Sequence, residues 1–248
     1  MRTIKAVIFD LDGTLVDSAP DIQVAINKLL AEEGRRPVTL EEVAAMIGDG
    51  APKLVERAMN ATGAGDTPED LSTLTRRFLG FYEGHTTDLT QPYPGVREAL
   101  ERLRSAGVRM AICTNKPERP TRELLRDLRL APYFQAVFGG DTVAGVKKPD
   151  PRLIHAVLDA LGARPMEAVM VGDAANDVAA ARAAGIPVIL RTGGYTRVPA
   201  EELDADHIIT DFLELPEAIR GFSAVDAGAT GEAADFYAKT ASERLQSS

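Results

Sequence analysis

The chain has 248 residues, of which 45% are hydrophobic and 26% charged, the composition of an ordinary globular protein with one or two domains. Its formal net charge of −9 disfavours nucleic acid and anionic membrane surfaces, so we expect neither as a partner. The single cysteine, Cys113, excludes an intrachain disulfide, and no apolar run resembles a signal peptide or a membrane span. We therefore expect a cytoplasmic protein, either a monomer or a homodimer.

The first predicted element is a strand at residues 6–9, which is followed at once by Asp10 and Asp12. From residue 17 to 91 the sequence has no convincing strand and only helical patterns, among them a capping box at Thr39 and a helix expected to begin at Thr67-Pro68. We therefore expect an all-helical cap domain over residues 17–91, inserted after the first strand. This insertion point lies at the carboxyl end of the strand, where open α/β sheets bind ligands.

The rest of the chain returns to alternating strands and helices. Short apolar runs predict further strands at 108–113, 136–138, 168–171, 186–190 and 207–209. The pattern predicts an α/β fold with a doubly wound, mostly parallel, Rossmann-like sheet, formed by residues 1–16 and 92–220 as the catalytic core. Residues 221–248, rich in Ala, Gly and Ser, are expected to form a tail that is a short helix or disordered.

Four aspartates follow two of the predicted strands. Asp10 and Asp12 follow the strand at 6–9, and Asp173 and Asp177 follow the strand at 168–171. Because the carboxyl ends of parallel strands share one edge of a sheet, the four side chains converge if these strands are neighbours. Converging carboxylates repel one another unless a cation lies among them. Oxygen ligands, with room left for water and substrate, favour Mg²⁺ over Ca²⁺.

Two other segments carry groups that bind anions. Thr114 and Asn115 follow the strand at 108–113 and offer a hydroxyl and an amide. Lys147 and Lys148 precede a helix start, and because adjacent side chains cannot point the same way, we expect one of them in the site and favour Lys148. A hydroxyl, backbone N–H groups and an ammonium beside Mg²⁺ form a site for a tetrahedral anion such as phosphate.

The paired aspartates suit two different roles in phosphoryl transfer. Asp10 is predicted to attack phosphorus and become an aspartyl-phosphate. Asp12 is predicted to donate a proton to the leaving alkoxide and then to remove one from the hydrolytic water. Lys148 and Thr114 are expected to hold the equatorial phosphate oxygens. These residues predict a Mg²⁺-dependent phosphatase acting on a small phosphorylated metabolite.

Four ordered motifs resemble those of the haloacid dehalogenase-like hydrolases, in particular the phosphatase branch with a helical cap inserted after the first motif. The motifs are DLDGT at 10–14, Thr114 in CTNK, Lys148 in KKPDP, and GDAAND at 172–177. The resemblance covers roughly residues 4–220, and four motifs in the family's order make it specific.

The resemblance also implies roles for the acidic residues. It implies that Asp10 is the nucleophile and that Asp12 is the general acid and base. The metal ligands it implies are Asp10, the main-chain carbonyl of Asp12, and Asp173. Asp177 is implied to support these ligands or to orient Lys148.

Within this family, the segments LVDSAPDI, IGDGAPKLVERA, CTNKP and GIPVILRTGGY are most similar to bacterial phosphoglycolate phosphatases. This similarity implies hydrolysis of 2-phosphoglycolate to glycolate and phosphate. Such a substrate presents a carboxylate. We expect Lys53 or Arg57, on the helix that follows IGDG, to meet that carboxylate when the cap closes.

The sequence leaves two alternatives open. One is a sugar phosphomutase of the same fold, which returns the phosphoryl group from Asp10 to a sugar. The other is a phosphatase for another small phosphorylated metabolite. A phospho-acceptor receiver module is disfavoured because a long-lived aspartyl-phosphate has no use for an acid/base group at Asp12. A carbon–halogen hydrolase is disfavoured because its chemistry needs neither a metal nor a proton donor at that position.

Overall fold

The computed structural model describes residues 3–63 and 70–224. Six parallel strands form its main sheet in the order β5-β4-β1-β6-β7-β8. Their bounds are β1 (Ala6–Phe9), β4 (Arg109–Cys113), β5 (Ala136–Phe138), β6 (Ala168–Gly172), β7 (Val188–Arg191) and β8 (His207–Ile209). All six predicted strands are present, with bounds that differ by at most two residues, and the predicted α/β class with a parallel sheet is confirmed.

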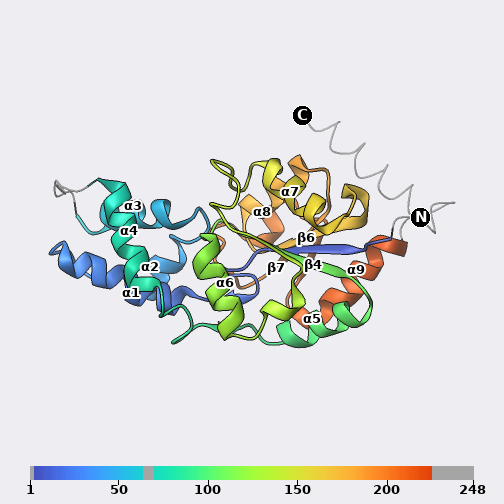
Figure 1. Ribbon diagram of the computed structural model, residues 1–248, viewed down its shortest axis with the longest axis horizontal. Coiled ribbons are helices and arrows are strands. Elements are labelled where there is room, and N and C mark those ends of the chain that lie inside the picture. Colours follow the sequence, from blue (N-terminus) through green and yellow to red (C-terminus); the bar gives the residue numbers. More distant parts are fainter. Residues whose placement is uncertain (1–2, 64–69, 225–248) are drawn as a thin grey trace.

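Helices cover both faces of the sheet (Figure 1). One face carries α5 (Val96–Ser105), α6 (Glu118–Asp127) and α9 (Leu215–Ala224), and the other carries α7 (Pro151–Leu161) and α8 (Ala175–Ala183). Successive strand residues point to opposite faces, so Val7 and Phe9 pack with the first group and Ala6 and Ile8 with the second. Burial on both faces explains why β1 is a continuous apolar run.

Short 3₁₀ turns connect some of these elements. They are η1 (Ala131–Tyr133), η2 (Pro165–Glu167), η3 (Ala200–Glu202) and η4 (Phe212–Glu214). In η4, the Asp211 carboxylate accepts a hydrogen bond from the Leu213 amide at 2.8 Å, which fixes the start of the turn just before α9.

A separate group of helices follows β1 and forms its own apolar cluster, at the left of Figure 1. It contains α1 (Ala19–Glu32), α2 (Leu40–Ala44), α3 (Ala51–Ala61) and α4 (Leu71–Tyr82). The capping box at Thr39 is confirmed, because Thr39 and Glu42 cap one another's backbone amides. The helix start predicted at Thr67-Pro68 lies outside the described residues. Within them, α4 begins at Leu71 after the cap residue Asp70.

A two-residue antiparallel pair, β2 (Val16–Asp17) and β3 (Gln91–Pro92), joins the two ends of the helical segment. These strands were not predicted, because two residues are too few to show a hydrophobic period. Nearby, the buried Asp21 of α1 accepts hydrogen bonds from the backbone amides of Leu89 and Thr90 and from the Thr90 hydroxyl. The chain therefore leaves and rejoins the core at neighbouring points.

At the other end of the chain, α9 extends to Ala224, so residues 221–224 of the expected tail belong to a helix. The short helix considered further along the tail lies outside the described residues. Among the helices of the described residues, none is long and apolar enough to cross a membrane.

Candidate active site

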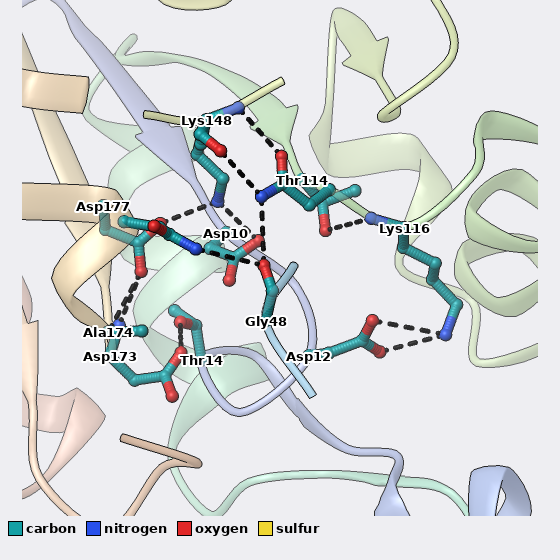
Figure 2. Close-up of polar contacts among 12 residues, drawn as sticks. Asp10, Asp12, Thr14, Gly48, Thr114, Lys116, Lys148, Asp173, Ala174 and Asp177 are labelled. Carbon is teal, nitrogen blue, oxygen red and sulfur yellow. Dashed lines mark hydrogen bonds and ion pairs between the residues drawn. The ribbon is translucent and has the colours of Figure 1, made fainter. Parts of the chain in front are cut away.

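The order of the strands brings the predicted site residues to one edge of the sheet. Because β1 lies between β4 and β6, the segments that follow these three strands are neighbours. Asp10 and Asp12 come from the end of β1, Thr114 from the end of β4 and Asp173 from the end of β6 (Figure 2). The Asp10 amide donates to the carbonyl of Val171 at 2.9 Å, which fixes the turn after β1 against β6.

Lys148 joins two buried carboxylates. Its Nζ lies 2.8 Å from Asp10 Oδ1 and 2.7 Å from Asp177 Oδ1, and Lys148 is only 4% exposed. Burial alone would lower the pKa of Lys148, but the charges of Asp10 and Asp177 outweigh it and hold this pKa above its usual value. The ammonium is therefore kept charged beside the predicted nucleophile.

Asp177 has donors on both carboxylate oxygens. Oδ1 accepts from Lys148, and Oδ2 accepts from the backbone amides of Asp173 and Ala174, each at 3.1 Å. Asp177 thus fixes both the direction of Lys148 and the loop that carries Asp173 at the start of α8. These contacts suit the supporting role expected for Asp177.

Asp173 is held by donors from two other loops. Its Oδ1 accepts from the Thr14 hydroxyl at 2.7 Å, and its Oδ2 accepts from the Tyr195 amide at 2.7 Å. A side chain at Gly13, which has a φ of +85°, or at Gly194 would collide with this carboxylate. The glycines of DLDGT and TGGY therefore let the backbone close around Asp173.

The carboxylate cluster carries more negative charge than its surroundings compensate. Burial raises the pKa of Asp10 to about 6, with Lys148 opposing the effect. Burial, followed by the charges of Asp177 and Asp10, raises the pKa of Asp173 to about 8. A bound cation would favour the ionised form of both groups.

The donor set fits a hard divalent cation. One carboxylate oxygen from each of Asp10, Asp173 and Asp177 lies within 4.8 Å of the others, and all three ligand atoms are oxygens. Asp10 Oδ1 is buried and accepts no hydrogen bond, although Lys148 Nζ is close to it. Asp177 Oδ1 pairs with the Lys148 ammonium and its Oδ2 accepts from two backbone amides, whereas each oxygen of Asp173 has one neutral donor, so Asp10 and Asp173 are the better direct ligands.

Asp12 points away from the carboxylate cluster of Asp173 and Asp177, toward a lysine that we did not predict (Figure 2). Lys116 Nζ lies 3.1 Å and 3.3 Å from the two carboxylate oxygens of Asp12 and donates to the Tyr82 hydroxyl at 2.8 Å. The Ser18 hydroxyl also donates to Asp12, at 2.6 Å. The available signal was the position of Lys116 in CTNK, two residues after Thr114.

A cavity lies between this edge of the sheet and the helical segment. Its core side includes Asp10, Asp12, Thr114 and Lys116, and its other side is mostly apolar. The apolar lining residues from the helical segment are Ile22, Ile47, Ala51, Leu54, Phe78, Leu79 and Tyr82. A ligand in the cavity would therefore contact both the charged strand ends and the inserted helices.

Two further predicted residues come from the turn after β4. Thr114 is buried, and its hydroxyl oxygen accepts from the Lys116 amide at 3.3 Å. The Asn115 side chain donates to the carbonyls of Gly48 and Lys148, each at 3.0 Å, and accepts from the Lys148 amide at 2.9 Å. The Asn115 amide therefore holds the loops together, while Asn115 still lines the cavity.

Lys53 and Arg57 do not line the cavity in the part of the chain that the structure describes. Lys53 forms an ion pair with Glu56 at 2.5 Å, and Arg57 pairs with Asp49 and donates to the Met46 carbonyl at 2.9 Å. Asp49 is held in addition by Asn176, at 2.6 Å. Arg57 therefore fixes the loop that contacts the core, and the predicted substrate contact of both residues stays a prediction.

Tyr195 is a second residue that the sequence did not single out. Its hydroxyl donates to Asp17 Oδ1 at 2.6 Å and accepts from the Ala19 amide at 2.9 Å. Since its own amide donates to Asp173, Tyr195 connects the carboxylate cluster to the start of the helical segment.

Known proteins are similar to this chain in sequence and in fold. Residues 4–185 match the family model described as haloacid dehalogenase-like hydrolase. A phosphoglycolate phosphatase of Rhodospirillum rubrum is 46% identical over 215 residues, covering 85% of this chain and 89% of its own. A phosphoglycolate phosphatase of Caulobacter vibrioides is 43% identical over 212 residues, covering 86% and 89%.

Solved structures agree with this relationship. A predicted phosphoglycolate phosphatase from Haemophilus somnus superposes with a TM-score of 0.82 at 30% identity, covering 87% of this chain and 97% of its own. CbbY from Rhodobacter sphaeroides, solved in complex with phosphate, has a TM-score of 0.75 at 26% identity, covering 86% and 96%. Together with the strand-end aspartates, these matches show that the chain belongs to the haloacid dehalogenase-like hydrolases.

Proposed function

We propose that this protein is a Mg²⁺-dependent phosphatase that hydrolyses 2-phosphoglycolate to glycolate and phosphate through an aspartyl-phosphate. The proposal depends on the position of Asp10. Its carboxylate pairs with Lys148, belongs to the acidic cluster with Asp173 and Asp177, and lines the cavity. The names of the relatives from Rhodospirillum rubrum and Caulobacter vibrioides support the choice of substrate. The lone buried thiol of Cys113 and the acidic net charge support a cytoplasmic location.

In the first step, a carboxylate oxygen of Asp10 attacks phosphorus, and the bond from phosphorus to the ester oxygen breaks. Lys148 and the Thr114 hydroxyl hold the phosphoryl oxygens as charge moves onto the leaving group. Asp10, Asp173 and the main-chain carbonyl of Asp12 would hold Mg²⁺, which offsets the repulsion between the Asp10 carboxylate and the phosphate dianion.

Asp12 supplies and removes the protons. It donates a proton to the ester oxygen as glycolate leaves, and then takes one from the water that attacks the aspartyl-phosphate. Hydrolysis releases inorganic phosphate and restores the Asp10 carboxylate. The Ser18 hydroxyl and Lys116 fix the direction of the Asp12 side chain toward the cavity.

The helical segment of residues 17–91 is proposed to be a cap domain that selects the substrate. Its side chains form a separate apolar cluster and supply most of the apolar wall of the cavity. Asn176 and Asn115 of the core bond to the loop at residues 48–49 of the segment. These contacts between the segment and the core support the proposed role of the segment as a cap.

A phosphate-release assay tests the proposed function. Wild-type protein is assayed on a panel of phosphate esters, including 2-phosphoglycolate, sugar phosphates and nucleoside monophosphates, with Mg²⁺ and with EDTA. We expect multiple turnovers and the highest kcat/KM on 2-phosphoglycolate, only with metal. Asp10→Asn serves as the inactive control. Isomerisation of a sugar phosphate without net phosphate release would instead identify a phosphomutase.

A further inference from the structure

The cavity has one cationic side chain among the described residues that line it. That residue is Lys116, whereas Lys148 lines a neighbouring pocket together with Asp173 and Asp177. Lys116 is only 7% exposed, and the opposite wall from the helical segment is mostly apolar. An anionic group on the leaving part of a substrate therefore has one place in the described cavity to find a positive charge.

Lys116 divides its hydrogen-bond donors between two side chains. A protonated lysine has three N–H donors. Within the described chain, Nζ has two acceptor groups, the Asp12 carboxylate and the Tyr82 hydroxyl. The contact to the second Asp12 oxygen, at 3.3 Å, is the longest of the three that Nζ makes. An anion in the cavity can replace this contact and keep the donors of the buried ammonium satisfied.

The distance between Lys116 and Asp12 matches a short substrate. The ester oxygen must lie within hydrogen-bond distance of Asp12, about 3 Å, to receive its proton. Lys116 Nζ lies 3.1 Å from the same carboxylate. In 2-phosphoglycolate a single methylene separates the ester oxygen from the carboxylate carbon, so one molecule can reach both side chains at once.

We propose that Lys116 binds the carboxylate of the leaving group and thereby selects short phosphate esters that carry an acid next to the ester carbon. This proposal rests on the proposed function, since it assigns a residue to its substrate. It replaces Lys53 and Arg57 as the source of the positive charge, because both of those side chains pair with carboxylates outside the cavity lining. Tyr82 is a positioning residue that holds Nζ at the wall.

The test compares two esters that differ in the carboxylate. The ratio of kcat/KM on 2-phosphoglycolate to kcat/KM on ethyl phosphate is measured for wild type, Lys116→Met and Lys116→Arg. We expect Lys116→Met to lower this ratio about a hundredfold, since a buried charge-assisted hydrogen bond is lost. Lys116→Arg keeps the charge and should retain most of the ratio. Lys28→Met, at an exposed position on α1, is the matched control and should leave the ratio unchanged.

The ratio separates carboxylate binding from an effect on Asp12, because losing the Lys116–Asp12 contact would slow both esters alike. An equal loss of kcat/KM on both esters, or a lower ratio in Lys53→Met instead of Lys116→Met, would overturn the proposal.

If wild type does not hydrolyse 2-phosphoglycolate, the proposed function fails. The role of Lys116 is then decided by inhibition constants of 2-phosphoglycolate and ethyl phosphate against p-nitrophenyl phosphate hydrolysis. Weaker inhibition by 2-phosphoglycolate alone in Lys116→Met would support the proposal, and unchanged inhibition would refute it.

Discussion

Replacing Asp173 by Asn should stabilise the metal-free protein while it destroys the metal site. Asp173 is 1% exposed, and burial together with Asp177 and Asp10 raises its pKa from 3.8 to about 8. A carboxyl group whose pKa is higher in the folded than in the unfolded protein contributes stability that is fully present at pH values below the unfolded-state pKa. That contribution is lost as the pH rises through the folded-state pKa. Wild-type protein should therefore lose stability from about pH 4 to pH 8 when no cation is bound.

The magnitude follows from the shift and from the hydrogen bonds that Asn can keep. At pH 8 the charge on Asp173 costs about 5 kcal/mol by linkage, and at pH 5 about 2 kcal/mol. An Asn side chain can accept from the Tyr195 amide and donate to the Thr14 hydroxyl oxygen, but neither hydrogen bond is then charge-assisted, which costs about 1–2 kcal/mol. The net expectation for Asp173→Asn is a gain of about 3 kcal/mol at pH 8 and almost none at pH 5.

Urea unfolding in EDTA at pH 5, 6, 7 and 8 measures this difference directly. Adding Mg²⁺ at pH 8 should raise the midpoint of wild type and leave that of the variant unchanged, because ligand binding stabilises only a protein that retains its site. Phosphate release by the variant should be lost. A free-energy difference between the two proteins that does not change with pH would refute the reasoning, as would equal stabilisation of both by Mg²⁺.

Three further substitutions test other parts of the site. Lys148→Met leaves Asp10 without its buried cation and should lower kcat/KM by about a thousandfold in a phosphate-release assay, because a close electrostatic contact to the reacting group is removed; activity near that of wild type would contradict this role. Asp12→Asn should slow turnover of alkyl phosphates by roughly a hundredfold or more. The loss should be smaller in release of p-nitrophenol from its phosphate ester, whose leaving group needs no proton, and an equal loss on both would argue against acid catalysis. Asn176→Ala removes the bond to Asp49 and should raise KM more than it lowers kcat in steady-state kinetics, whereas an effect on kcat alone would place Asn176 in the chemical step.

The core fold could be predicted because its sequence signals are local and strong. The run at β1 is apolar on both faces, and Asp150-Pro151 before α7 and Gly162 after it mark the two ends of that helix. The pair of β2 and β3 could not be predicted, because it depends on two segments more than seventy residues apart meeting at the base of an insertion. No local pattern encodes such a contact.

Some residues of the candidate site could be predicted from local motifs, and others could not. Asp10, Asp173 and Lys148 could be named because each follows a strand or precedes a helix in a recognisable motif. Lys116 had only its position in CTNK as a signal, and Tyr195 had none. Their importance comes from the side-chain contact of Lys116 with Asp12 and the backbone contact of Tyr195 with Asp173, which only the folded chain reveals. The predicted contact between Lys53 and the substrate carboxylate depended only on the position of Lys53 on its helix. Helix position does not reveal that Lys53 forms an ion pair with Glu56.

The pairing of β2 with β3 has a consequence for how this scaffold can change. Because Val16 pairs with Pro92, β2 and β3 form a narrow stalk of two strands through which the chain leaves the main sheet and returns to it. Helices beyond that stalk can be lengthened, shortened or exchanged without altering the spacing of the strand ends that carry Asp10 and Asp173. A different helical segment attached at this stalk could therefore change the substrate, while the strand-end residues that carry out phosphoryl transfer keep their positions.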